Sequence, residues 1–93
     1  MNKEELKKEI NITIDDMSSK INEMKSKKES VVDSLKNKYN ETIQIMETEK
    51  ADLQAKYMSI EDSNETKWDE VKSSLDSAKS SFKEGFKELA TIV

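Results

Sequence analysis

One stretch of the chain begins like a calcium-binding loop. The twelve residues DSNETKWDEVKS, starting at Asp62, place oxygen-bearing side chains at loop positions one, three and five, as an EF-hand loop does. The pattern then fails twice. Lys67 stands where the loop needs a glycine to bend the chain, and Ser73 stands where it needs a bidentate glutamate. We therefore expect no calcium site here.

Two carboxylate clusters are the other candidates for binding a divalent metal ion. Asp15 and Asp16 are adjacent, and Glu47 and Glu49 are close neighbours. On a helix such groups usually face solvent and pair with a lysine one turn away. Di-iron bundles combine glutamates with a Glu-x-x-His motif, and the sequence has no histidine. We predict no metal site and no bound cofactor.

The chemistry available for catalysis is narrow. Histidine, cysteine and arginine are all absent, so lysine, tyrosine and carboxylates would have to supply every acid, base and nucleophile. Two narrow helices also offer little concave surface for an active site. We therefore predict a non-enzymatic protein without catalytic residues. Trp68, the single tryptophan, is predicted to seal a corner of the fold by packing.

The composition is typical of long, solvated helices. The chain is 33% hydrophobic and 39% charged, with one glycine and no proline, so residues that form tight turns are scarce. The net charge is −4, and all 16 basic residues are lysine. Without arginine, which most often reads phosphates and guanine, we expect no nucleic-acid partner. The lack of cysteine and of any long apolar run predicts a soluble, cytoplasmic protein.

Apolar residues recur at helical spacing in two stripes. The first begins at Leu6 and continues, mostly in steps of three and four residues, to Ile60. The second begins at Trp68 and continues in the same way to Val93. These two stripes predict two helical segments.

The segment EDSNET, residues 61–66, separates the two stripes. Asp62, Ser63 and Asn64 are all favourable N-cap residues, and Asp62 with Glu65 has the spacing of a capping box. We therefore expect a turn here, followed at once by a new helix.

The favoured fold is all-α: one unit of residues 1–93, built as an antiparallel helical hairpin with coiled-coil packing. Its first helix would cover about residues 3–60 and its second about residues 65–92. At 1.5 Å per residue these helices would be roughly 85 Å and 40 Å long, so the second covers only half of the first. The uncovered seam predicts a homo-oligomer, a dimer or a tetramer. Its interface residues are Leu6, Ile10, Ile14, Met17, Ile21 and Met24.

Apolar residues from both stripes are predicted to hold the hairpin together. They are Leu53, Tyr57, Trp68, Val71, Leu75 and Phe82. The alternative fold is a three-helix bundle with a turn near residues 27–30, where Lys28 interrupts the stripe and Ser30 with Asp33 offers an N-cap. The segment KSKKES contains no glycine, proline, asparagine or aspartate, and the hairpin is favoured for that reason.

Three segments of the stripes carry a resemblance, in register, to a known group of proteins. They are Met17, Ile21 and Met24 at spacings of four and three, the central KYNETIQIM, and the tryptophan-headed KWDEVKSSLDSAKSSFKEGF. In this register, over nearly its whole length, the chain resembles small bacterial stress-associated coiled-coil proteins of the cyanobacterial type, whose function is obscure. It departs from them at Met17, where an aromatic residue is common, and in its serine-rich last helix. The resemblance implies no catalytic or ligand-binding residues.

The predicted function is a scaffold or protein–protein contact made by a homo-oligomer, and the resemblance adds a stress-associated role. The alternative is a stress protectant or peripheral lipid binder that uses the amphipathic C-terminal helix. The serine and aspartate of that helix suit anionic lipid poorly, and its apolar stripe already has a partner in the first helix. A protein partner is therefore favoured over a membrane surface.

Overall fold

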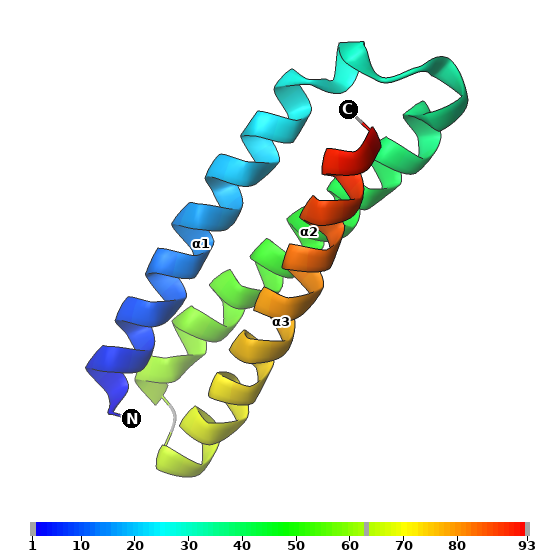
Figure 1. Cartoon of the computed structure of the whole chain (residues 1–93). Helices are drawn as coiled ribbons and strands as arrows, with labels where there is room; N and C mark the ends of the chain where they lie inside the picture. Colours follow the sequence, from blue (N-terminus) through cyan, green and yellow to red (C-terminus); the bar gives the residue numbers. More distant parts are fainter. Residues whose placement is uncertain (1, 63, 93) are drawn as a thin grey trace.

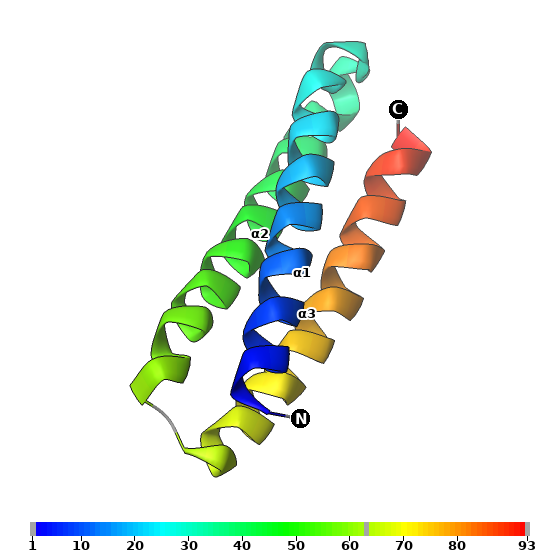
Figure 2. The same ribbon diagram turned by 90° about the vertical axis from the view of Figure 1, so that its left-hand side faces the viewer.

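The chain folds into three antiparallel helices joined by two short connections. The computed structural model describes residues 2–62 and 64–92. Its elements are α1 (Lys3–Ser26), η1 (Lys28–Ser30), α2 (Asp33–Ser59), η2 (Ile60–Asp62) and α3 (Glu65–Ile92), where η marks a 3₁₀ helix. α2 runs against both α1 and α3, and the three lie side by side in both views (Figures 1 and 2). The bundle measures 48 × 17 × 17 Å, and the all-α prediction is confirmed.

The predicted single helix over residues 3–60 is wrong. The first helix ends at Ser26, and the second begins at Asp33, as the alternative three-helix bundle requires. The helices have similar lengths of 24, 27 and 28 residues, so α3 extends along nearly the whole of α1 (Figure 1). The bare seam that motivated a homo-oligomer does not exist in this fold.

The first connection turns the chain without glycine or proline. The Ser30 amide donates to the Lys27 carbonyl at 3.0 Å, and the Val31 amide donates to the Lys28 carbonyl at 3.1 Å. Val31 and Val32 are then extended, with ψ of 134° and 146°. No described residue has a positive φ. Because every backbone angle here suits ordinary residues, the absence of special turn residues could not exclude a turn.

Two buried side chains hold this connection in place. Val31, only 3% exposed, reaches into the end of the core. The fully buried Tyr39 hydroxyl donates to the Met24 carbonyl at 2.5 Å, which ties the last turn of α1 to α2. Burial, helped by the charge of Glu23, raises the pKa of Tyr39. The N-cap of α2 is Val32 without a side-chain cap, so the predicted cap at Ser30 is wrong.

The second connection lies where the break in the stripes predicts it. The side-chain oxygen of Asn64 accepts a hydrogen bond from the Lys67 amide at 3.2 Å, so Asn64 caps the start of α3. Ser63 and the side chains of Asp62 and Glu65 lie outside the described residues, and the predicted capping box lies there with them.

The core runs the whole length of the bundle. Its fifteen buried apolar side chains in the described part are at most 6% exposed. They are Leu6, Ile10, Met17, Ile21, Met24, Val31, Tyr39, Ile43, Met46, Leu53, Ile60, Val71, Leu75, Phe82 and Leu89. Ile14, Tyr57 and Trp68 pack against this cluster. The six residues predicted to form an intermolecular seam thus belong to the core of a single chain, together with the six predicted to hold the hairpin.

Ion pairs tie α1 to the connection between α2 and α3. The Glu61 carboxylate contacts the Lys3 ammonium at 2.8 Å and also the Lys7 ammonium. Lys7 lies over the Tyr57 ring, 5.4 Å from its centroid. Hydrogen bonds from both lysines, reinforced by their charges, lower the pKa of Glu61 to about 2.

Glu61→Gln should be less stable than the wild type at neutral pH. This difference should disappear in acid, where the wild type loses the contribution of the Glu61 carboxylate. The pKa of about 2 in the fold lies below the ordinary 4.5, so the stabilisation is complete above about pH 4.5 and disappears as the pH falls towards 2. The difference in melting temperature between wild type and Glu61→Gln should therefore be largest near neutral pH and should shrink in acid. Glu84→Gln, at an exposed site, is the control. A difference that does not change with pH would refute the Glu61 assignment.

Replacing Gly85 with alanine should stabilise the bundle by about 0.5–1 kcal/mol, because glycine is unfavourable inside a helix. A Cβ at this position would lie 3.4 Å from Met46 Cγ and 3.6 Å from the Thr42 methyl carbon. Methionine is flexible enough to accommodate that contact. Urea unfolding measures the change. Gly85→Val, which adds two more carbons against α2, should lose the gain. A lower urea midpoint for Gly85→Ala would contradict this prediction and would show that α2 and α3 cannot move apart enough to accept the added methyl group.

Candidate functional site

Of the four carboxylates singled out in the sequence, Asp15, Asp16 and Glu47 serve as surface groups. Asp16 pairs with Lys20 at 3.1 Å within α1, and Glu47 of α2 pairs with Lys25 of α1. Asp15 is exposed. Among the described residues, no group of three or more aspartates or glutamates is placed to hold a metal ion. The calcium-loop segment is helical from Glu65 onward, so it does not form a loop around a central cation.

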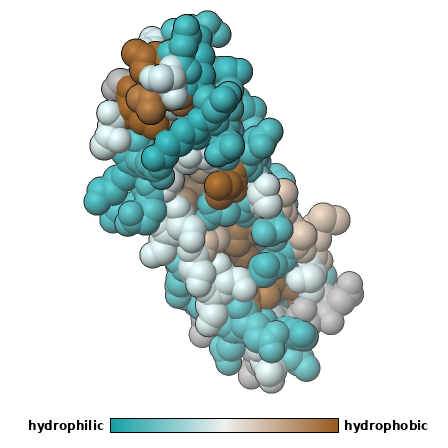
Figure 3. Space-filling view, turned by 90° about the vertical axis from the view of Figure 1, so that its right-hand side faces the viewer, coloured by the Kyte–Doolittle hydropathy of each residue, from teal (hydrophilic) through white to brown (hydrophobic). Residues whose placement is uncertain are grey.

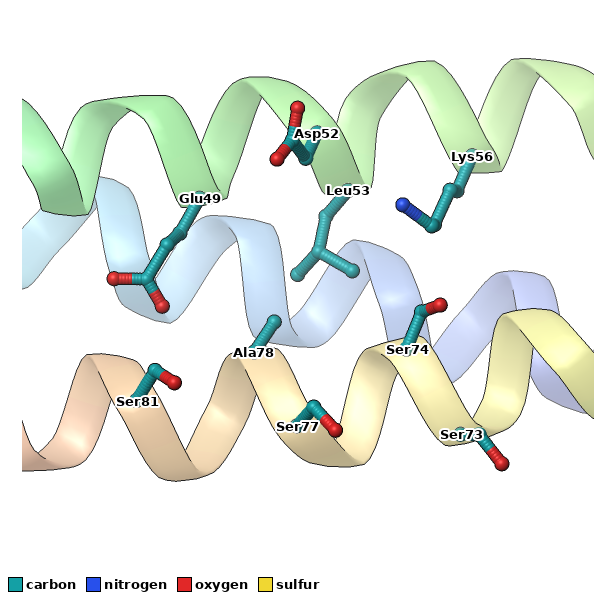
Figure 4. Close-up of a pocket in the computed structure, with 9 residues that line it drawn as sticks. All are labelled: Glu49, Asp52, Leu53, Lys56, Ser73, Ser74, Ser77, Ala78 and Ser81. Carbon is teal, nitrogen blue, oxygen red and sulfur yellow. The ribbon is translucent and has the colours of Figure 1, made fainter.

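A polar groove lies between α2 and α3 (Figure 4). Its volume is about 380 Å³, and its lining residues are Glu49, Asp52, Leu53, Lys56, Ser73, Ser74, Ser77, Ala78 and Ser81. Figure 4 shows Glu49 and Leu53 directed from α2 towards α3, whereas Ser73 points away. The groove exists because serine and alanine side chains on α3 are too short to fill the space beside α2.

Glu49 is the one residue lining this described α2–α3 groove that has an unsatisfied buried polar atom. One of its carboxylate oxygens is buried and has no hydrogen-bond partner. Loss of solvent, together with the nearby charge of Asp52, raises the pKa of Glu49. No serine in the described groove bonds to a base that could activate it as a nucleophile. The groove is therefore a polar hollow with one unsatisfied carboxylate oxygen.

A second groove lies between α1 and α3 and is mainly apolar. Its volume is about 410 Å³. We call it the α1–α3 groove, and it is lined by Ile12, Thr13, Asp16, Met17, Lys20, Lys79, Phe82 and Lys83. Buried Met17 and Phe82 form its floor, and Ile12 is 59% exposed. Of the three helix pairs, α1 and α3 are the least closely packed, which leaves this groove open.

Lysines border the α1–α3 groove. Lys79 and Lys83 on α3 form no ion pair within the described part of the chain, and Lys20 on α1 lies over the Phe86 ring at 5.3 Å from its centroid. The one carboxylate of the lining, Asp16, is already paired with Lys20. The groove thus joins an apolar floor to a rim with net positive charge.

Large apolar side chains at the described surface are few. They are Ile12, Val32, Ile45 and Met58, each at least 59% exposed. The face in Figure 3 is mainly hydrophilic, with hydrophobic residues gathered at one end and scattered along its middle. Val32 and Met58 lie at the ends of the bundle, whereas Ile12 and Ile45 lie in the middle of α1 and α2. These two central isoleucines are the unusual features of the surface.

The alternative prediction was that the C-terminal helix binds lipid, but in the structure α3 is packed against the rest of the bundle. Its apolar face contributes Val71, Leu75, Phe82 and Leu89 to the core, and Trp68 packs against that core. Lipid binding by this face would require the bundle to open. Over the described residues, no helix combines the length and the apolar character needed to span a membrane.

Comparison with protein families, curated proteins and solved structures gives no match. The resemblance to stress-associated coiled-coil proteins therefore stays a prediction. The lining of the α1–α3 groove includes residues that the sequence did not single out, chiefly Ile12, Lys79 and Lys83. A signal for Ile12 exists, because it falls between Ile10 and Ile14 and outside the helical stripe. The two lysines, with Lys87, flank the apolar stripe of the last helix, but nothing in the sequence marks them as the rim of a groove.

Proposed function

We propose that the protein is a non-enzymatic interaction module that binds another polypeptide in its α1–α3 groove. The observation that carries this proposal is the open apolar floor of the groove, Met17 and Phe82, beside an exposed isoleucine and a lysine rim. An amphipathic helix commonly binds in a groove of this kind, with its apolar side chains on the floor and its charged ones at the rim.

The chemistry of the chain fits such a role better than catalysis. The sequence has no histidine, cysteine or arginine, and the groove holds a single carboxylate, which is already neutralised by Lys20. The rim favours a partner segment that carries acidic residues beside its apolar ones. Scaffolding through such a contact needs no reacting group.

Site-specific photo-cross-linking tests the proposal. A benzophenone amino acid replaces Ile12 in the groove and, as a matched control, the exposed Ser80 on α3, in cells of the organism that encodes the chain. We expect protein adducts from position 12 and far fewer from position 80. Adducts of equal strength at both positions, or none at position 12, would refute the proposed function.

A further inference from the structure

We propose that the occupant of the α1–α3 groove is a second copy of the same chain, which inserts the outer surface of its α2. This inference rests on the proposed function and names the partner. The inserting surface, here called the α2 ridge, is the strip of α2 around the exposed Ile45, whose residues Glu41, Gln44, Ile45, Thr48 and Glu49 also line a shallow surface hollow.

The α2 ridge combines an apolar side chain with negative charge, which complements the apolar floor and lysine rim of the groove. Ile45 is 60% exposed at its centre, and Glu41 and Glu49 stand one turn before and one turn after it. Neither carboxylate forms an ion pair within the described residues, and a buried oxygen of Glu49 has no partner. The nearby Lys38 is neutralised by Glu88 at 2.8 Å. The ridge is therefore an exposed isoleucine beside the exposed, unpaired carboxylate of Glu41, with Glu49 at its border with the α2–α3 groove.

The groove offers charges of the opposite sign. Lys79 and Lys83 lie four residues apart on α3, about 6 Å along a helix, and this span falls within the roughly 12 Å that separates Glu41 from Glu49 on α2. Ile12 of the groove would meet Ile45 of the ridge, so that each covers apolar surface that is exposed in the free chain. A single α2 helix seated between α1 and α3 of the other copy has the ordinary geometry of helix packing.

The placement of the two surfaces determines how copies can associate. The groove is lined by α1 and α3 alone, and the ridge belongs to α2 alone, so the two cannot meet within one chain. Because the groove opens between α1 and α3 and the ridge lies on α2, a pair joined by one groove–ridge contact leaves one groove and one ridge free. Copies would therefore add head to tail, and association would grow with protein concentration and weaken in salt.

Two full-length variants test this geometry by sedimentation velocity over a range of concentrations. Ile45→Lys disables the ridge, and the double variant Lys79→Glu/Lys83→Glu disables the groove. All these sites are exposed, so circular dichroism should show an unchanged helix content. The wild type should form growing oligomers, and each variant alone should associate at least tenfold more weakly. An equimolar mixture of the two should form heterodimers and nothing larger, because one working ridge meets one working groove.

Other outcomes separate this inference from the proposed function. Met58→Lys removes an exposed apolar side chain (75% exposed) outside both surfaces and should leave association unchanged. A wild type that stays monomeric, or a mixture without heterodimers, would overturn the head-to-tail contact. If cross-links from position 12 then reach a different protein, the proposed function stands without self-association. If Ile45→Lys loses helix content, Glu41→Lys at an exposed site replaces it as the ridge variant.

Discussion

Replacing Ile21 with aspartate should unfold most of the protein. Ile21 is 2% exposed in the core of the single chain. The substitution would remove about 2–5 kcal/mol of apolar packing and leave an unpaired carboxylate that costs about 3–5 kcal/mol more, a total comparable to the roughly 5–15 kcal/mol that stabilises a small domain. Protonation of the aspartate would lessen this cost only in acid. Circular dichroism at neutral pH should show a large loss of helix, and urea titration should show a much lower midpoint.

The control for this prediction is the same substitution at Ile12. This residue lies in the same helix but is 59% exposed, so Ile12→Asp should change the unfolding free energy by less than about 1 kcal/mol. The hairpin model makes the opposite prediction for Ile21, because it places this residue at the contact between chains. An Ile21→Asp variant that kept its helix content while a larger assembly dissociated would support that model against the three-helix bundle.

Proline at position 32 should be tolerated, whereas proline at position 41 should strongly destabilise the chain. Val32 has φ of −64°, close to the angle that proline imposes, and Val31 before it is extended, as a residue preceding proline prefers. Val32→Pro should therefore change stability by no more than about 1 kcal/mol, in the stabilising direction if little packing is lost. Glu41→Pro, in the interior of α2, should cost about 3 kcal/mol or more.

The pair of proline variants measures where the helix is interrupted. Both positions are exposed, so buried side chains contribute little to the comparison, and thermal unfolding followed by circular dichroism is sufficient. If residues 3–60 formed one helix, both prolines would be equally damaging. Comparable losses at positions 32 and 41 would therefore contradict the turn between α1 and α2.

Membership of the core was predictable because it follows from local spacing. A helix repeats every 3.6 residues, so apolar residues three and four apart share one face wherever the helix ends. Ile21 and Leu75 are accordingly buried, although Ile21 was predicted to contact another chain and Leu75 to hold the hairpin together. The prediction failed on what that face contacts, because spacing says nothing about whether the covering helix comes from the same chain.

The grooves could not be predicted in this way. They depend on how closely α1 approaches α3 and on where short side chains face α2, and both are properties of packing between helices. Ile12 and Ile45 lie off the apolar stripes, and this was visible in the sequence. Their exposure, and the placement of Lys79 and Lys83 beside Ile12, required the arrangement of the helices.

The sequence by itself determined that this protein is helical, which face of each helix is apolar and that the chain turns after Ile60. These are local properties, set by the spacing of side chains and by Asn64 as a cap. Only the tertiary structure decided that α1 ends at Ser26. An uninterrupted helix would satisfy the backbone equally well, but it would leave the N-terminal stripe in water. Folding back buries that stripe, and the contact from Tyr39 to Met24, 15 residues apart, stabilises the turn.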